Sequence, residues 1–229
     1  MLIRRATATK KFGRAARFSS VLAAAAIGRA GATTSDTAAR ADAAGAVYVA
    51  ELHPLNTGIA GSDTIGKARI MVRGDVLKIT IDVKGAPPDI EHWQHFHGFK
   101  DGRVATCPTA AADTNHDGVI DLIETEATSG TTMVPFNDAP ATMQIPTETY
   151  PKASAKGSYS YEKIVSLKAL QEAFAVAFGG QHLALDHRVI FIHGVPATTK
   201  LPASVVSLGS IPASVTLPIA CGKIERAAG

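Results

Sequence analysis

Two histidines two positions apart, His95 and His97, are the residues whose type and spacing most clearly suit chemistry. They lie in an apolar stretch that predicts a strand over 92–99. Residues two apart on a strand point to the same side, so His95 and His97 present their imidazoles together while His92 faces away. Imidazole nitrogens of this kind are ligands for copper or zinc. The alternative is that a pair of this kind is common and only forms hydrogen bonds at the surface.

Two further features strengthen the metal interpretation. His193 ends a separate apolar strand predicted over 188–193 and is a third candidate ligand. The chain has two cysteines, Cys107 and Cys221, and Cys107 follows His97 by ten residues. A lone pair of cysteines in an exported chain predicts one disulfide. The alternative, two free thiols, requires a reducing compartment.

Residues 113–124 match the twelve-residue calcium loop of an EF-hand, with Gly118 at its sharp turn. Their flanks are too short for the two helices of an EF-hand. We therefore expect a structural Ca²⁺ that orders the long 107–130 connection, and the alternative is an acidic turn with chance spacing. The predicted ligands are the side chains of Asp113, Asn115, Asp117, Asp121 and Glu124 and the carbonyl oxygen of Val119.

The elements that must position these residues are mainly strands. Apolar residues make up 46% of the chain and come in short runs, which favours a β-sandwich or barrel over a helix bundle. One helix is predicted over about 166–178, with Ser166 as its N-cap and Gly179 after its end. The remaining predicted strands are 47–52, 68–72, 76–83, 132–136, 142–145, 158–165 and 216–224, with a turn at 73–75 joining the second and third.

The start of the chain resembles an export signal. Residues 1–32 combine a basic start, a short apolar run and a small-residue cleavage pattern, and 33–45 has the composition of a linker before a domain over 46–226. Residues 1–32 hold seven of the 23 Lys and Arg and none of the 20 acids, which leaves a net charge of −4 for the rest. That charge and the absence of a basic stripe argue against nucleic-acid binding. No later apolar stretch is long enough for a membrane span, so we expect a periplasmic or extracellular protein.

Three sequence features together resemble the copper–zinc superoxide dismutase family. They are the spacing His92-x-x-His95-x-His97-x-Phe99, the later apolar strand ending in His193, and Ala-Cys-Gly-Lys-Ile at 220–224. The likeness covers most of 46–224, and the chain is also similar to bacterial secreted proteins with CHRD domains. The resemblance implies a Greek-key β-sandwich in which His95, His97 and His193 bind catalytic copper. It also implies that His92 supports the site from behind and that Cys107 and Cys221 form the family's internal bridge.

The chain departs from that family at two places. The family's zinc loop carries three histidines and an aspartate, whereas residues 98–181 contain only His116, so no zinc site of the family type is expected. His116 is a candidate fourth copper ligand, the alternative being a histidine that faces solvent. Pro218 stands where the family has the arginine that attracts superoxide, so electrostatic steering is weakened. Arg188 or Lys200 are the candidates to replace that charge.

Three functions follow from these observations. The first is an exported copper-dependent superoxide dismutase, an oxidoreductase acting on superoxide or another small molecule. The second is a non-catalytic CHRD-like module that binds a metal and calcium, and the third is a periplasmic copper buffer. The calcium-type loop and Pro218 favour the second.

Overall fold

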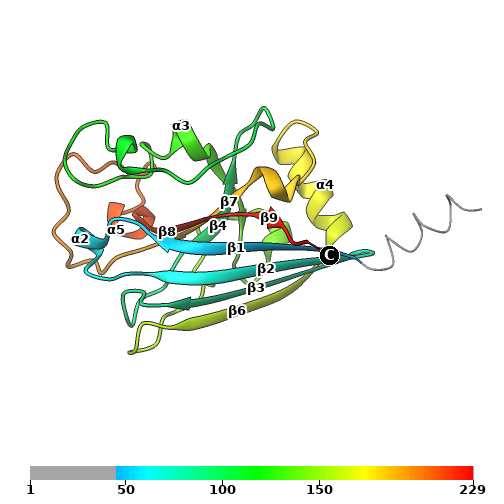
Figure 1. Cartoon of the computed structure of the whole chain (residues 1–229), viewed down its shortest axis with the longest axis horizontal. Helices are drawn as coiled ribbons and strands as arrows, with labels where there is room; N and C mark the ends of the chain where they lie inside the picture. Colours follow the sequence, from blue (N-terminus) through cyan, green and yellow to red (C-terminus); the bar gives the residue numbers. More distant parts are fainter. Residues whose placement is uncertain (1–44, 229) are drawn as a thin grey trace, which may run out of the picture.

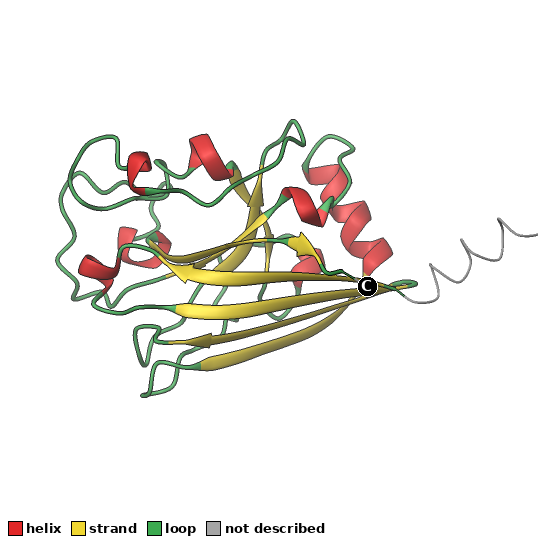
Figure 2. Cartoon of the chain, in the orientation of Figure 1, coloured by secondary structure: helices red, strands yellow, loops and turns green. Residues whose placement is uncertain are grey.

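The computed structural model of this chain describes residues 45–228. The predicted signal peptide, 1–32, and all but the last residue of the predicted linker, 33–45, lie outside the described residues. The described part is mainly β, as predicted, and Figure 2 shows the strands in one curled sheet with short helices and loops gathered over one side.

Every strand pair in the sheet is antiparallel, and the strands follow the order β5-β4-β7-β8-β1-β2-β3-β6, with β9 beside β1. The strands are β1 (Ala46–Pro54), β2 (Ile65–Arg73), β3 (Val76–Lys84), β4 (Gln94–Gly98), β5 (Thr131–Pro135), β6 (Tyr159–Ser166), β7 (Val189–His193), β8 (Pro218–Lys223) and β9 (Glu225–Arg226). The helical elements are α2 (Thr57–Ala60), η1 (Ala110–Ala112), α3 (Glu126–Ser129), η2 (Pro140–Thr142), α4 (Leu167–Ala177), η3 (Leu185–His187) and α5 (Ala213–Thr216).

Strand β1 joins the two halves of the sheet. Its first seven residues pair with β2, and its last two, His53 and Pro54, pair with β8 (Figure 1). The main apolar core lies between the halves, because residues of β3 such as Ile79 pack in one cluster with Phe96 of β4 and Ile190 of β7. Burial of this apolar surface stabilises the fold by about 25 cal/mol per Å².

The predicted helix and the predicted 73–75 turn are confirmed. Helix α4 begins after Ser166, whose Oγ accepts a hydrogen bond from the amide of Ala169, and its buried face carries Leu170 and Phe174. Strands β2 and β3 form a hairpin in which Gly74 has a φ of 55°, a left-handed conformation that glycine adopts without strain.

One strand prediction was wrong, and another extended too far. Residues 142–145 form no strand: η2 ends there and Met143 has a left-handed backbone, followed by Pro146, which cannot donate a ladder hydrogen bond. The strand predicted over 92–99 is only Gln94–Gly98. His92 therefore precedes the strand, and the alternation that assigned its direction does not apply to it.

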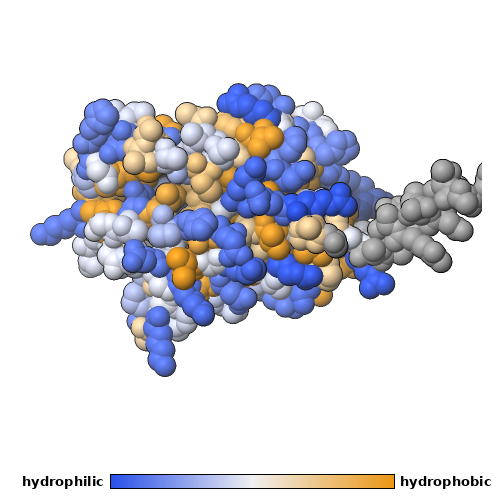
Figure 3. Space-filling view, in the orientation of Figure 1, coloured by the Kyte–Doolittle hydropathy of each residue, from blue (hydrophilic) through white to orange (hydrophobic). Residues whose placement is uncertain are grey.

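Cys107 and Cys221 form a disulfide, as predicted, between residues 114 apart in the chain. It ties the loop after β4 to strand β8. On the face shown in Figure 3, polar residues dominate and apolar residues form small separate patches. Within 45–228, no helix is both long and apolar enough to cross a membrane.

Candidate metal centre

The structure brings the three predicted histidines together. His95 and His97 alternate along β4, and His193 ends the neighbouring strand β7, with its amide bonded to the carbonyl of Trp93. Because residues opposite one another in an antiparallel pair share a face, all three imidazoles lie on one side of the sheet. One ring nitrogen from each lies within 4.8 Å of the other two, and together they could hold a metal ion.

This face of the sheet is opposite to the main core. Phe96, which alternates with the two β4 histidines, packs in the main core, whereas Phe191 belongs to a smaller apolar cluster and lies 4.7 Å from the His97 ring. Loops cover the histidines, which are only 3%, 0% and 2% exposed for His95, His97 and His193. The site is therefore shielded from bulk water although it lies outside the main core.

Four nitrogens of these rings have no hydrogen-bond partner. They are both ring nitrogens of His95, Nδ1 of His97 and Nε2 of His193. Across residues 45–228 no other buried side-chain nitrogen or oxygen is left unpaired. An unsatisfied buried polar atom costs about 1–3 kcal/mol. A bound metal ion would accept the lone pair of one nitrogen from each ring, which satisfies three of these four atoms. The donor set thus fits a metal ion.

Hydrogen bonds orient two of the rings. The carbonyl of Thr216 can only accept, so Nδ1 of His193, 2.8 Å away, carries the hydrogen and Nε2 keeps its lone pair. Nε2 of His97 lies 3.1 Å from the hydroxyl of Thr132, whereas its Nδ1 has no hydrogen-bond partner. Such partners on the far nitrogen fix the ring orientation of metal-binding histidines.

Burial keeps the three imidazoles neutral. It lowers the pKa of His193 to about 4 and lowers the pKa values of His95 and His97 well below their usual range, with the nearby charge of His193 as the second cause. At neutral pH each ring therefore keeps the lone pair that a metal requires.

His92 contacts the main chain at the end of β7. It is fully buried; its Nδ1 lies 3.0 Å from the carbonyl of His193 and its Nε2 2.9 Å from that of Pro87. Its ring also stacks on Tyr159, with the centroids 5.8 Å apart. His92 thus positions the end of β7 and offers no nitrogen to the cluster.

His116 is not brought to the three histidines. It is exposed on the 107–130 loop, with a left-handed φ of 59°, and is not a member of the cluster. The two candidate replacement cations are also elsewhere. Arg188 is fully buried and donates to the carbonyls of Leu183 and His182, while Lys200 is exposed.

A cavity of about 290 Å³ opens in front of His95 and His193. Its other lining residues are apolar or threonine: Trp93, Leu122, Thr131, Thr132, Ile145, Pro146, Leu208, Ile211 and Thr216. The sequence interpretation did not identify this lining, because most of its apolar residues come from irregular loops without periodicity. The one feature of the sequence that could have indicated a lining residue was the position of Trp93, two residues before His95.

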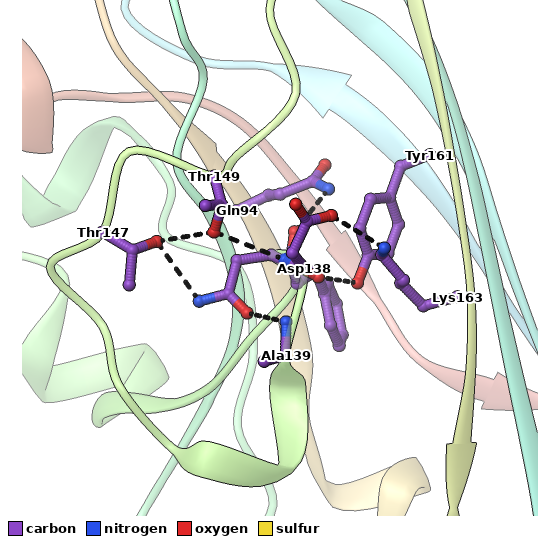
Figure 4. Close-up of polar contacts among 9 residues, drawn as sticks. Gln94, Asp138, Ala139, Thr147, Thr149, Tyr161 and Lys163 are labelled. Carbon is purple, nitrogen blue, oxygen red and sulfur yellow. Dashed lines mark hydrogen bonds and ion pairs between the residues drawn. The ribbon is translucent and has the colours of Figure 1, made fainter.

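A polar network holds the segment that carries Ile145 and Pro146. The side-chain amide of Asn137 donates to the carbonyl of Gln144, and the main-chain carbonyl of Asn137 accepts from the Tyr161 hydroxyl. Figure 4 shows the neighbouring contacts, in which Thr147 and Thr149 bond to each other and Asp138 pairs with Lys163 of β6. One wall of the cavity is therefore fastened to the far half of the sheet.

The calcium-type loop folds around its own carboxylates. Asp113 accepts from the amide of Gly118, whose φ is 85°, and Glu124 accepts from the amides of Thr114, Asn115 and Asp121. The first and last predicted ligands thus close one loop. Among the described residues these carboxylates form no group as tight as that of the histidines.

The loop also contacts the segment before α5. The Asp121 carboxylate accepts from the amide of Val206, 2.6 Å away, and Asp117 accepts from the Ser204 hydroxyl. Figure 1 shows these two loops, drawn green and orange, at the same end of the molecule. Because Leu122 and Leu208 both line the cavity, the loop and the histidine site share a wall.

Comparison with known proteins does not identify a family. No protein-family model matches the chain. No curated protein matches it either.

Proposed function

We propose that this protein binds one copper ion through His95, His97 and His193. The observation that carries the proposal is the set of unpaired buried ring nitrogens, all of which belong to these three neutral rings. Three imidazoles on two adjacent strands suit copper better than a hard cation such as calcium, and zinc is the main competitor. A copper ion there would supply one-electron redox chemistry.

The chain's own residues define the rest of the site. Thr216 and Thr132 hold the rings of His193 and His97, and the surrounding loops exclude bulk water. The cavity leaves one side of the cluster accessible to a small molecule. No lysine or arginine lines it, so a reaction with superoxide would lack electrostatic steering. We propose superoxide dismutation as an activity of this site that is slow for that reason.

The wider proposals follow the resemblance. The curled antiparallel sheet is proposed to have the superoxide dismutase-type Greek-key arrangement. The disulfide is typical of an oxidising compartment, which supports an exported protein. The rival function is a non-catalytic metal-binding module or copper buffer, which the uncharged cavity favours.

We further propose that residues 113–124 bind a structural Ca²⁺. The EF-hand spacing is complete, and Gly118 has the backbone conformation that the sixth position of such a loop requires. The ion would hold the long connection between β4 and β5 against the segment 196–212.

Metal analysis of the purified protein, followed by a superoxide assay with copper restored, tests the central proposal. We expect about one copper per chain, lost in His193→Ala and kept in His53→Ala, since His53 is an exposed histidine of β1 outside the cluster. Copper with measurable dismutation supports the enzyme, and copper without it supports the module or buffer. Absence of copper binding overturns the proposal.

A further inference from the structure

We propose that the cavity in front of His95 and His193 binds a small uncharged molecule, mainly apolar, that presents one donor atom to the metal position. That the donor atom of this molecule would bind copper rests on the proposed function. The apolar character of the cavity does not, because it follows from the lining residues alone.

The wall of the cavity offers an ion nothing to pair with. Its apolar residues come from three loops and from Trp93, which directly precedes β4, and no aspartate, glutamate, lysine or arginine is among the lining residues. Transfer of an unpaired ion out of water is strongly unfavourable. Transfer of apolar surface out of water is favourable, by about 25 cal/mol per Å². The cavity therefore discriminates against charged ligands.

The polar atoms in the wall are already mostly engaged. The hydroxyl of Thr132 bonds to His97 and that of Thr216 lies 2.8 Å from the Ser207 hydroxyl. The buried polar atoms at the cavity that lack a partner are both ring nitrogens of His95 and Nε2 of His193. A ligand that fits these groups has one donor at the metal end and apolar surface elsewhere.

The dimensions suit a ring-sized molecule. A dry cavity of about 150 Å³ accommodates benzene, and this one has about 290 Å³. The half-buried Trp93 contributes an aromatic wall, held between Tyr150, 5.4 Å away in a stacked geometry, and the edge of His95. Leu208 at the mouth is 45% exposed, so a ligand would cover apolar surface that now contacts water.

Trp93 is the only tryptophan in the chain, so its fluorescence reports directly on the cavity. The test titrates metal-free and copper-loaded protein at pH 8 with 4-phenylimidazole, imidazole and azide. The added ring should bring at least about a tenfold tighter dissociation constant than imidazole, from the apolar area it buries. A perturbation of Trp93 fluorescence by 4-phenylimidazole is expected even without copper.

A charge placed at the mouth sharpens the test. Leu208→Lys should weaken 4-phenylimidazole and strengthen azide, while Val176→Lys, at an exposed position of α4 that does not line the cavity, should change neither. Equal affinity for imidazole and 4-phenylimidazole, or tighter binding of azide by the unaltered protein, would overturn the inference. Copper binding without any apolar preference rejects this inference alone. An apolar ligand reported by Trp93 in a protein that fails to bind copper rejects the copper function alone.

Discussion

His193 donates the hydrogen on its Nδ1 to the main-chain oxygen of Thr216, at 2.8 Å. That bond leaves the lone pair on Nε2, one of the four unpaired buried nitrogens of the cluster. Thr216, which precedes β8, also lines the cavity. Orientation of a metal ligand and shape of the cavity therefore depend on the same short segment.

Loss of the Thr132 hydroxyl should weaken the metal site without unfolding the protein. Thr132→Val is nearly isosteric and removes the partner of His97 Nε2. Loss of such an outer partner typically costs about 10–100-fold in metal affinity. Thr80→Val is the matched control, because its hydroxyl bonds to the carbonyl of Arg69 on the other half of the sheet. Copper titration of both variants checks this, and equal affinities would remove the role given to Thr132.

The metal-free protein should lose stability as the pH falls from about 6.5 to 4. Burial lowers the pKa of His193 from an ordinary 6.5 to about 4, so in this window the unfolded chain binds a proton that the folded chain does not. The free energy of unfolding therefore decreases as the pH is lowered, by on the order of 3 kcal/mol for this residue alone. Above pH 6.5 the ring is neutral in both states and contributes no slope.

Urea denaturation in a metal chelator at several pH values measures this effect. His193→Gln should make the dependence shallower, and the part that remains comes from His95 and His97, whose pKa values burial also lowers. A flat profile between pH 6.5 and 4 in the unaltered protein would show that His193 is not buried in its neutral form.

Calcium removal should weaken copper binding. The Asp121 carboxylate holds the amide of Val206, and Leu122 lines the cavity, so loosening of this loop disturbs a wall of the histidine site. Glu124→Gln should lower the melting temperature and remove its dependence on calcium. Glu126→Gln is the matched control, because Glu126 is a nearby exposed acid, and it should have neither effect. Copper affinity that is the same with and without a calcium-selective chelator would contradict the coupling.

Reduction of the disulfide should destabilise the fold strongly. It closes a loop of 114 residues, for which the chain-entropy model gives about 4–5 kcal/mol. Denaturant midpoints of the oxidised protein and of Cys107→Ser/Cys221→Ser check the value. A difference below about 1 kcal/mol would mean that the unfolded chain is already compact in this region.

Much of the site could be predicted because strand geometry is local. Alternation placed His95 and His97 on one side, and the apolar run before His193 predicted its strand. That the two strands are neighbours depends on long-range pairing, which the resemblance supplied and periodicity could not. Strand alternation does not apply to His92, because the strand begins at Gln94. The direction of the His92 side chain is set by its contacts with the carbonyls of Pro87 and His193.

The cavity could not be predicted at all. Ile145 lies where a strand was expected and Pro146 follows it, and the left-handed Met143 together with the Asn137 contacts gives that segment its path. Leu208 and Ile211 follow β7 in a loop whose position depends on contacts with Asp117 and Asp121. Such placements depend on side-chain hydrogen bonds between distant segments, which leave no pattern in the sequence.

The central claim is tested most directly by titration of the metal-free protein with Cu²⁺, followed by electron paramagnetic resonance. We predict saturation at about one copper per chain and a spectrum with coupling to imidazole nitrogen. Both should be lost in His95→Ala/His97→Ala and kept in His53→Ala. The same spectrum in the double variant, or no saturable binding in the unaltered protein, would contradict the assignment.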